Sequence, residues 1–517
     1  MTELIESIGE MLMAGYPGTD PAAAAELIQR YRVGGIILFS RNVKDADHAR
    51  AVCSKLQELR QSVSDSPLFI AIDQEGGCVA RITEGVTVFP GNMALGATRS
   101  EELARQVASV TAAELFALGI NVNFAPVLDI SSNPRNPGVG ARSFGADAAL
   151  VARLGSAMIR GMQENGMCAA AKHFPGLGEA RVDSHDELPR VDAALERMKK
   201  RELLPFEAAI DAEVAFVMTA HCSYSALDNT LAPATMSRAI LTDLLRNRLG
   251  FKGIIISDCL EMGAIEKHFP APQAAVATAR AGADMMLICH TLDKQIAAID
   301  SLKNAVRTGE LSEKRVRNVL SAISSIKKAL RFEQGPPYRA DKPQKSVSEE
   351  VASRAITIVR NEDSLLPFKL AASDQLAVVV PSFESLTKVE EAAEPHEAFI
   401  HKLRRYHLNT LFCSVGVKPT EVEVRKCVDI CRNADVVVVV TYNLHQYIVQ
   451  KDFVHMLLGL GKPAVVAAVR DPYDLAFVPE ARACVATYSF RQCSLKALAG
   501  VLFGQVEATG ELPVELG

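Results

Sequence analysis

Eight short apolar segments, each followed by a polar break and in most cases by a stretch of helical period, constrain the fold of the first two thirds of the chain. The segments lie at 11–15, 35–39, 68–73, 122–126, 169–173, 216–221, 253–258 and 284–289, and helical stretches lie at 100–118, 148–165, 193–211, 272–281 and 311–330. Parallel strands that are buried on both faces have continuous apolar sequences, and their alternation with helices is typical of a (β/α)8 barrel. We therefore expect residues 1–332 to form an α/β, TIM-like barrel.

The rest of the chain predicts a linker and a second α/β domain. Residues 333–348 are rich in Pro, Lys and Gln and lack hydrophobic periodicity, as expected of a semi-stiff linker. Five further apolar segments with helices between them lie at 376–381, 409–415, 436–441, 464–470 and 483–489. They predict a three-layer α/β/α sandwich over residues 349–517. This part contains neither a GxGxxG motif nor a Walker loop, so we expect no nucleotide there.

Composition excludes several classes of partner. The net charge is only −5 over 517 residues, without a basic cluster, which argues against nucleic acid. No apolar run reaches the roughly 18–20 residues of a membrane span, and the start, MTELIESIGEML, lacks the apolar core of a signal peptide. The eleven cysteines show neither a CxxC pair nor zinc-binding spacing, so we expect reduced core residues and a cytoplasmic protein without metal or other cofactor. The oligomeric state is not predictable from these features.

Polar residues gather where the expected barrel strands end. Asp73, Asp129, His221 and Asp258 follow four of the strands, and Lys172-His173 ends a fifth. Barrel enzymes build their active sites at the carboxyl ends of their strands. Five polar strand ends on one rim therefore predict an active site there.

An acid and an imidazole lie two residues apart in the loop after the fifth segment. Asp183 and His185 can point to the same side of an extended backbone, where the carboxylate would orient a proton-shuttling imidazole. A solvated loop with incidental charges is the alternative for so short a pattern.

Asp258 ends the nearly all-apolar stretch GIIISD and has three possible roles: a nucleophile, a metal ligand or a helix N-cap. A metal is poorly supported, because no set of three or four ligands has a recognised spacing. The rim opposite Asp258 carries Lys172 and His173, with Arg81 and Arg142 from other segments. Such a cationic, hydrogen-bonding lining suits a polyhydroxylated substrate.

The chain resembles glycoside hydrolase family 3, in particular its β-N-acetylhexosaminidase branch. The stretches that carry the resemblance are GGIILFSRN (34–42), IDQEGGCVARI (72–82), NFAPVLDISSNPRNPGVGARSFG (123–145), KHFPGLGEARVDSHDELP (172–189), MTAH (218–221), PATMS (233–237) and GFKGIIISDCLEMGAI (250–265). They follow the family's order and cover essentially the whole first domain. VASRAITIVRNEDSLLP (351–367), RDPYDL (470–475) and ATGELPVEL (508–516) also look like that family's second domain.

The resemblance implies a retaining exo-β-N-acetylglucosaminidase that removes terminal GlcNAc from short oligosaccharides, such as muropeptide or chito-oligosaccharide fragments. It implies that Asp258 is the nucleophile and that His185, held by Asp183, is the general acid/base. It also implies that the sugar is bound by Asp73, Arg81, Arg142, Lys172, His173 and Asp129. Most retaining glycosidases use two carboxyl groups, so a histidine acid/base is a departure from the common arrangement.

Three features depart from the family's usual pattern. Cys78 replaces a usual Arg, Leu177-Gly178-Glu179-Ala180 replaces a usual HGDT, and only Asp258 precedes Cys259 where many members have two acids after the strand serine. We expect Cys78 to be a small buried hydrophobic residue. The alternatives are a β-glucosidase, a phosphorylase of the same family, and a sugar-binding protein that has lost turnover.

Overall fold

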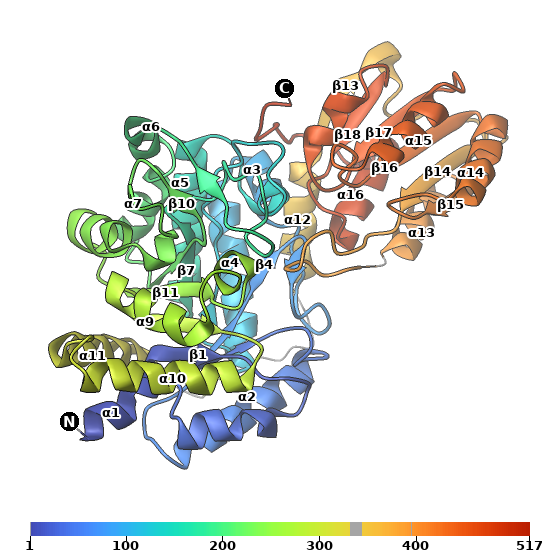
Figure 1. The fold of residues 1–517 in the computed structure, drawn as a ribbon. Coiled ribbons are helices and arrows are strands. Elements are labelled where there is room, and N and C mark those ends of the chain that lie inside the picture. Colours follow the sequence, from blue (N-terminus) through green and yellow to red (C-terminus); the bar gives the residue numbers. More distant parts are fainter. Residues whose placement is uncertain (1, 331–343, 394, 517) are drawn as a thin grey trace.

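The structure is a computed structural model that describes residues 2–330, 344–393 and 395–516. Its first domain is a closed barrel of eight parallel strands (Figure 1), in the order β1-β12-β11-β9-β7-β6-β3-β2. The strands are β1 (Leu12–Ala14), β2 (Gly35–Leu38), β3 (Phe69–Ile72), β6 (Val122–Asn123), β7 (Cys168–Phe174), β9 (Phe216–Thr219), β11 (Ile254–Cys259) and β12 (Met285–Ile288). All eight predicted segments form strands, and the barrel is confirmed.

The barrel closes where its first strand fits between its last and its second. Leu12 pairs with Met286 on β12 and Met13 pairs with Gly35 on β2, both in parallel register. Almost every strand residue is buried, which explains why the strands have continuous apolar sequences rather than alternating ones. With the strands in one direction, all their carboxyl ends meet on one rim.

Helices surround the barrel (Figure 1). They are α1 (Thr2–Glu6), α2 (Ala46–Gln61), α3 (Asn92–Thr98), α4 (Glu101–Ala117), α5 (Ala148–Glu164), α6 (Leu195–Lys200), α7 (Leu204–Asp211), α8 (Gly263–Glu266), α9 (Ala271–Ala281), α10 (Leu292–Arg307) and α11 (Glu313–Ala329). The 3-10 helices are η1 (Ser7–Met11), η2 (Pro21–Ala24), η4 (Gly140–Arg142) and η5 (Ala234–Met236), and the π-helices are η3 (Glu26–Arg30) and η6 (Ala239–Arg248). The rim carries small strands β4 (Gln74–Gly76), β5 (Val79–Ala80), β8 (Arg190–Val191) and β10 (Ser223–Tyr224). The expected helix 193–211 is two helices, α6 and α7, because Pro205 lies in the first turn of the second.

The second domain is a six-stranded mixed sheet in the order β13-β18-β17-β16-β14-β15. Its strands are β13 (Thr357–Asn361), β14 (Leu376–Pro381), β15 (Thr410–Val415), β16 (Val436–Thr441), β17 (Ala464–Ala468) and β18 (Ala483–Ala486). Its helices are α12 (Lys345–Ala355), α13 (His396–Tyr406), α14 (Glu421–Asn433), α15 (Ile448–Leu458) and α16 (Gln492–Leu502), with turns η7 (Glu362–Ser364) and η8 (Pro472–Phe477). The predicted sandwich is confirmed, with antiparallel β13 added at one edge.

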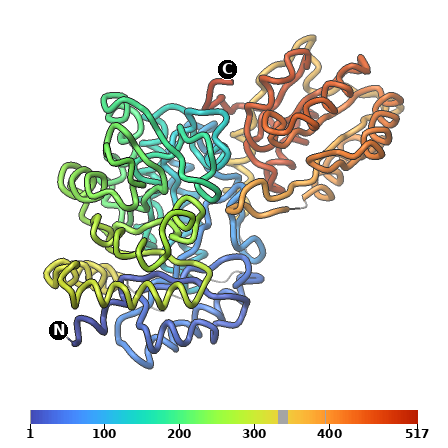
Figure 2. The backbone as a smooth tube through the Cα atoms, viewed as in Figure 1, coloured from blue at the N-terminus to red at the C-terminus, as the bar shows by residue number. Residues whose placement is uncertain are grey.

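The two domains are joined at several places. Residues 333–343 of the expected linker lie outside the described residues, whereas residues 345–348 already form the first turn of α12. Ser348 donates to the carbonyl of Val88 at 2.7 Å. The C-terminal tail returns to the barrel (Figure 2), where Ala146 N–H donates to Pro513 O at 2.9 Å.

The cysteines correct one expectation. Cys413 and Cys427 form a disulfide between β15 and α14, so the chain is not wholly reduced in this structure. The other nine cysteines are free, and all but Cys493 are buried. Among the described helices, none combines the length and apolarity that crossing a membrane requires.

Candidate active site

A cavity of about 540 Å³ opens at the carboxyl ends of the barrel strands and is bordered by a loop of the second domain. Its lining includes the expected site residues together with Phe39, Arg41, Ser184, Glu261, Lys388, Val389, Glu390 and Glu391. Of the nine residues that the sequence singled out, eight line this cavity directly: Asp73, Arg81, Arg142, Lys172, His173, Asp183, His185 and Asp258. The ninth, Asp129, is fully buried just behind it.

A compact group of oppositely charged side chains lies at the bottom of the cavity, on one side. Lys172 Nζ contacts Asp73 Oδ1 and Glu75 Oε1, each at 2.7 Å. Arg142 donates two parallel hydrogen bonds to Glu75, at 2.9 and 2.8 Å. Burial opposes ionisation of Glu75, but the two cations outweigh it and hold the pKa of Glu75 well below its usual range. The group therefore presents fixed charges and donors to anything in the cavity.

Removing Glu75 is expected to destabilise the fold, because it would leave Arg142 without its buried partner and Lys172 with only Asp73. Breaking such a buried pair costs about 3–5 kcal/mol. The free energy of unfolding of Glu75→Ala, measured in urea, should fall by about that amount. The control is Glu164→Ala, since Glu164 pairs with Arg105 at the surface, where a pair contributes at most about 1 kcal/mol. Equal losses in the two variants would contradict this account of Glu75.

His173 and Asp129 form a second buried pair. His173 Nδ1 is 2.7 Å from Asp129 Oδ2, and the other carboxylate oxygen accepts the backbone N–H of Leu177 at 2.6 Å. The far ring nitrogen, His173 Nε2, lies 4.0 Å from Asp258 Oδ2. Asp129 thus fixes the orientation of His173 and the start of the loop that contains Leu177.

Asp183 and His185 face each other, as their spacing allowed. His185 Nδ1 is 2.7 Å from Asp183 Oδ1, and the same oxygen accepts the His185 backbone N–H at 2.9 Å. Burial lowers the pKa of His185, but the hydrogen bond and charge of Asp183, with the charge of Asp258, raise it above its ordinary value. Within the described part of the chain the Nε2 atom has no hydrogen-bond partner, so it is available to a ligand.

Asp258 is the last residue but one of β11, and its side chain is 20 % exposed. Burial opposes its charge, yet nearby His221, His173 and His185 and the N–H of Cys259 lower its pKa below the ordinary value. His221 is held by Thr235 at 2.7 Å and by the carbonyl of Cys259 at 2.9 Å. Asp258 accepts a hydrogen bond from the N–H of Cys259, its own next residue. The next helix, α8, has Met262 as its N-cap, so Asp258 does not cap it.

The second domain reaches the same cavity through residues 388–391. Arg81 donates to the carbonyl of Val389 at 2.7 Å and pairs with Glu391, and it lies 3.7 Å from Asp73. Arg470 pairs with Glu390 inside the second domain. Asp471, the next residue, accepts the N–H of Ala141 at 2.7 Å and so fixes η4, which carries Arg142. Both Arg81 and Arg142 thus depend on the second domain for their position.

Several residues of the site were absent from the predicted set, namely Glu75, which is buried behind the lining, and Arg41 and the segment 388–391, which line the cavity. Glu75 lies two residues after Asp73 in the same polar segment at the end of a strand, so this segment could have indicated Glu75 as a site residue. The segment 388–391 lies in a loop of the other domain and no sequence spacing connects it to the barrel rim. Cys78 is buried against the second domain and its carbonyl accepts Glu391 N–H at 3.0 Å, which confirms the expected small buried residue.

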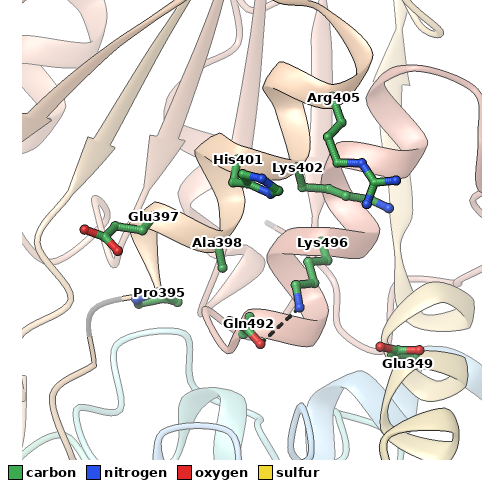
Figure 3. Close-up of a pocket in the computed structure, with 9 residues that line it drawn as sticks. All are labelled: Glu349, Pro395, Glu397, Ala398, His401, Lys402, Arg405, Gln492 and Lys496. Carbon is green, nitrogen blue, oxygen red and sulfur yellow. Dashed lines mark hydrogen bonds between the residues drawn. The ribbon is translucent and has the colours of Figure 1, made fainter.

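A larger hollow of about 740 Å³ lies elsewhere, beside α13 and α16 (Figure 3). Its lining carries His401, Lys402, Arg405 and Lys496, and the last donates to Gln492 at 3.1 Å. No carboxylate–imidazole pair lies among its lining residues. The cavity at the barrel rim is therefore the better candidate for chemistry.

The rim cavity combines a carboxylate, an oriented imidazole and a rigid set of charged donors and acceptors. A carboxylate can act as a nucleophile, and an imidazole with a raised pKa can donate and accept a proton near neutral pH. The remaining charges suit a ligand that carries several hydroxyl groups. This combination fits group transfer at an acetal carbon.

Comparisons with known proteins agree with this chemistry. Residues 3–326 match the family model described as the glycosyl hydrolase family 3 N terminal domain. The chain is 32% identical over 559 residues to beta-hexosaminidase A of Pseudoalteromonas piscicida, covering 96% of this chain and 91% of that protein. It is 29% identical over 541 residues to a beta-N-acetylglucosaminidase/beta-glucosidase of Cellulomonas fimi, covering 99% and 93%.

Among solved structures, a glycoside hydrolase family 3 beta-N-acetylglucosaminidase from Paenibacillus sp. str. FPU-7 superposes with a TM-score of 0.95 at 37% identity, over 99% of each chain. A beta-glucoside phosphorylase superposes with a TM-score of 0.83 at 21% identity, which shows a shared fold alone. The similarity to the first structure extends over both domains.

Proposed function

Because this chain belongs to glycosyl hydrolase family 3 and is a glycoside hydrolase, we propose that it is a retaining exo-β-N-acetylglucosaminidase. The observation that carries the proposal is the hydrogen-bonded Asp183–His185 pair facing the same cavity as Asp258. Its relatives named for hexosaminidase or β-N-acetylglucosaminidase activity support the choice of sugar. The bordering loop of the second domain suits an enzyme that acts on chain ends.

The proposed reaction has two steps. Asp258 attacks the anomeric carbon while protonated His185 Nε2 donates its proton to the departing glycosidic oxygen, giving a covalent glycosyl-enzyme and a free aglycone. Neutral His185 then takes a proton from water, which attacks the same carbon and releases Asp258. Two displacements return the sugar with its original anomeric configuration. His173 and His221 keep Asp258 ionised for the first step.

The remaining expected residues are proposed to hold the sugar. Lys172, Asp73 and Arg81 offer donors and an acceptor for hydroxyl groups on one side of the cavity. Arg142 is already committed to Glu75 and to the carbonyl of Gly138, so we assign it to positioning that side. His173, oriented by Asp129, lies next to Asp258 and completes the lining near the reacting carbon.

The pH dependence of kcat/KM should respond to Asp183. Asp183 raises the pKa of His185, so the acid form persists to higher pH and the rate falls as the pH rises through that pKa. In Asp183→Asn the carboxylate charge that raises the pKa of His185 is lost, whereas the burial that lowers this pKa remains. The alkaline limb of kcat/KM for an alkyl glycoside should therefore move to lower pH. Asp186→Asn is the control, because Asp186 lies three residues after Asp183 and is exposed beside Lys388, so this variant should leave the limb in place. A common shift in both variants would contradict the assignment.

The choice of sugar and acceptor is tested by rates on p-nitrophenyl β-GlcNAc and β-glucoside, each with and without inorganic phosphate. The proposal expects preference for GlcNAc and no response to phosphate. Preference for glucose would favour a β-glucosidase. This is the specific alternative because the Cellulomonas fimi relative is named for both activities. Stimulation by phosphate would indicate a phosphorylase, and no release from either substrate would favour a sugar-binding protein without turnover.

We further propose muropeptide fragments as the natural substrate and the cytoplasm as the site of action. Nine free cysteines, eight of them buried, suit a reducing compartment, although one disulfide is present. Lys388 at the cavity edge supplies a positive charge for an acidic aglycone. Lys388→Gln should lower kcat/KM for an acidic GlcNAc-terminated fragment but not for neutral chitobiose; equal effects would contradict this role.

A further inference from the structure

Two thiols and an imidazole meet next to Asp258, in a group that the proposed reaction does not use. Cys259 follows Asp258 at the end of β11, and Cys289 and His290 follow β12. The two strands are parallel neighbours, with Cys259 paired to Leu287 in register. Strand pairing therefore brings together residues that are 30 positions apart in sequence, which explains why no ligand spacing was recognisable.

The ligand atoms of Cys259, Cys289 and His290 all lie within 4.8 Å of one another. Around a tetrahedral Zn²⁺ with bonds of about 2.3 Å to sulfur and 2.0 Å to nitrogen, these atoms would be separated by about 3.5–3.8 Å. Both thiols are buried and His290 is exposed, so the imidazole has room to turn toward the sulfurs. Within the described part of the chain, no other His, Cys, Asp and Glu side chains form such a group of three.

The surroundings suit a soft divalent cation. Thiolate and imidazole are the ligands that Zn²⁺ prefers. Arg41 already contacts the carbonyl of Cys289 at 2.7 Å, and Glu261 accepts the N–H of His290 at 2.6 Å, so one positive and one negative side chain border the group. All three candidate ligands line the same cavity as Asp258, through which an ion can enter.

We propose that Cys259, Cys289 and His290 bind one Zn²⁺ per chain, with water in the fourth position, and that this ion inhibits the enzyme. The inhibitory part rests on the proposed function. Cys259 donates its N–H to Asp258 and accepts from His221 through its carbonyl, so a ligand bond to its sulfur acts directly on the backbone that positions Asp258. The two thiols release their protons as they bind the ion, so its charge is offset and inhibition acts through this backbone.

The binding site is tested without reference to activity. Cobalt(II) titrated into the whole protein, in a buffer containing a non-chelating phosphine reductant, should produce a near-ultraviolet thiolate-to-cobalt band that saturates at one ion per chain and disappears on addition of Zn²⁺. The band should be lost in Cys289→Ala and retained in Cys493→Ala, because Cys493 is the free cysteine that is not fully buried and lies outside this group. Absence of a band in the unmodified protein, or its persistence in Cys289→Ala, would overturn the site.

Inhibition is then measured on an aryl β-GlcNAc, with each variant normalised to its own rate in EDTA. Zn²⁺ should inhibit the unmodified protein and Cys493→Ala at the same concentration, and EDTA should restore the rate. For Cys289→Ala the inhibitory concentration should rise at least about 100-fold, since even indirect support of a metal ligand contributes 10–100-fold to affinity. An unchanged inhibitory concentration would place the ion elsewhere, for example on His185. A protein without turnover but with the cobalt band would refute the proposed function and leave the site intact.

Discussion

Asp258→Ala should lose about 10⁴- to 10⁶-fold in kcat on aryl β-GlcNAc while keeping its fold. Removal of an activated nucleophile has effects of this size because no neighbouring group replaces it. The side chain is 20 % exposed and, within the described residues, it accepts a hydrogen bond only from its own neighbour, Cys259, so truncation leaves no buried partner charge. Steady-state kinetics and a urea unfolding curve measure the two effects separately.

Rescue distinguishes a missing nucleophile from a damaged site. Azide can occupy the space left by the carboxylate and attack the anomeric carbon once, which would give a glycosyl azide of inverted configuration. Asp243→Ala, at an exposed position of η6, is the control and should keep full activity. Loss of less than about tenfold in Asp258→Ala would contradict its role.

His185→Ala should have an effect that depends on the leaving group. General acid catalysis contributes about 10²–10⁴-fold. Alkyl alcohols need that proton and nitrophenol does not, so kcat/KM should fall by about this factor for a methyl or sugar aglycone and by less than about tenfold for nitrophenol. kcat/KM is the informative quantity because it reports the first chemical step alone.

His268→Ala is the matched control, because His268 is an exposed histidine after α8 with no role in the cavity. It should leave both rates unchanged. Equal losses for alkyl and nitrophenyl substrates in His185→Ala would mean that the imidazole positions the substrate rather than protonating it. A solvated loop with incidental charges would predict no loss with either substrate.

The barrel was predictable because its strands are short and buried on both faces. Segments such as GIIL and FIAI have no polar residue between breaks, so their positions could be read directly from the sequence. The prediction of one continuous helix over 193–211 was wrong. The apolar residues keep their helical spacing past Pro205, so the spacing does not indicate the break between α6 and α7. Periodicity predicts which residues are buried more reliably than where a helix is interrupted.

The site was predictable where its residues end strands or follow them at short spacing. Asp258, Lys172 and the Asp183–His185 pair fall in this class, and the structure brings them to one cavity. Glu391 could not be found in this way, because it contacts Arg81 across 310 residues of sequence. The disulfide between Cys413 and Cys427 was missed for a similar reason, since it depends on the packing of α14 against β15 and not on a recognised motif.

The most direct test of the account is the identification of the covalent intermediate. The protein would be incubated with a 5-fluoro β-GlcNAc fluoride, a reagent whose fluorine slows hydrolysis of the glycosyl-enzyme, and analysed by intact and peptide mass spectrometry. The account predicts one sugar per chain, attached to Asp258 within GIIISDCLEMGAI and absent from Asp258→Ala. Attachment at another residue, or turnover without any attached sugar and with an inverted product, would contradict it.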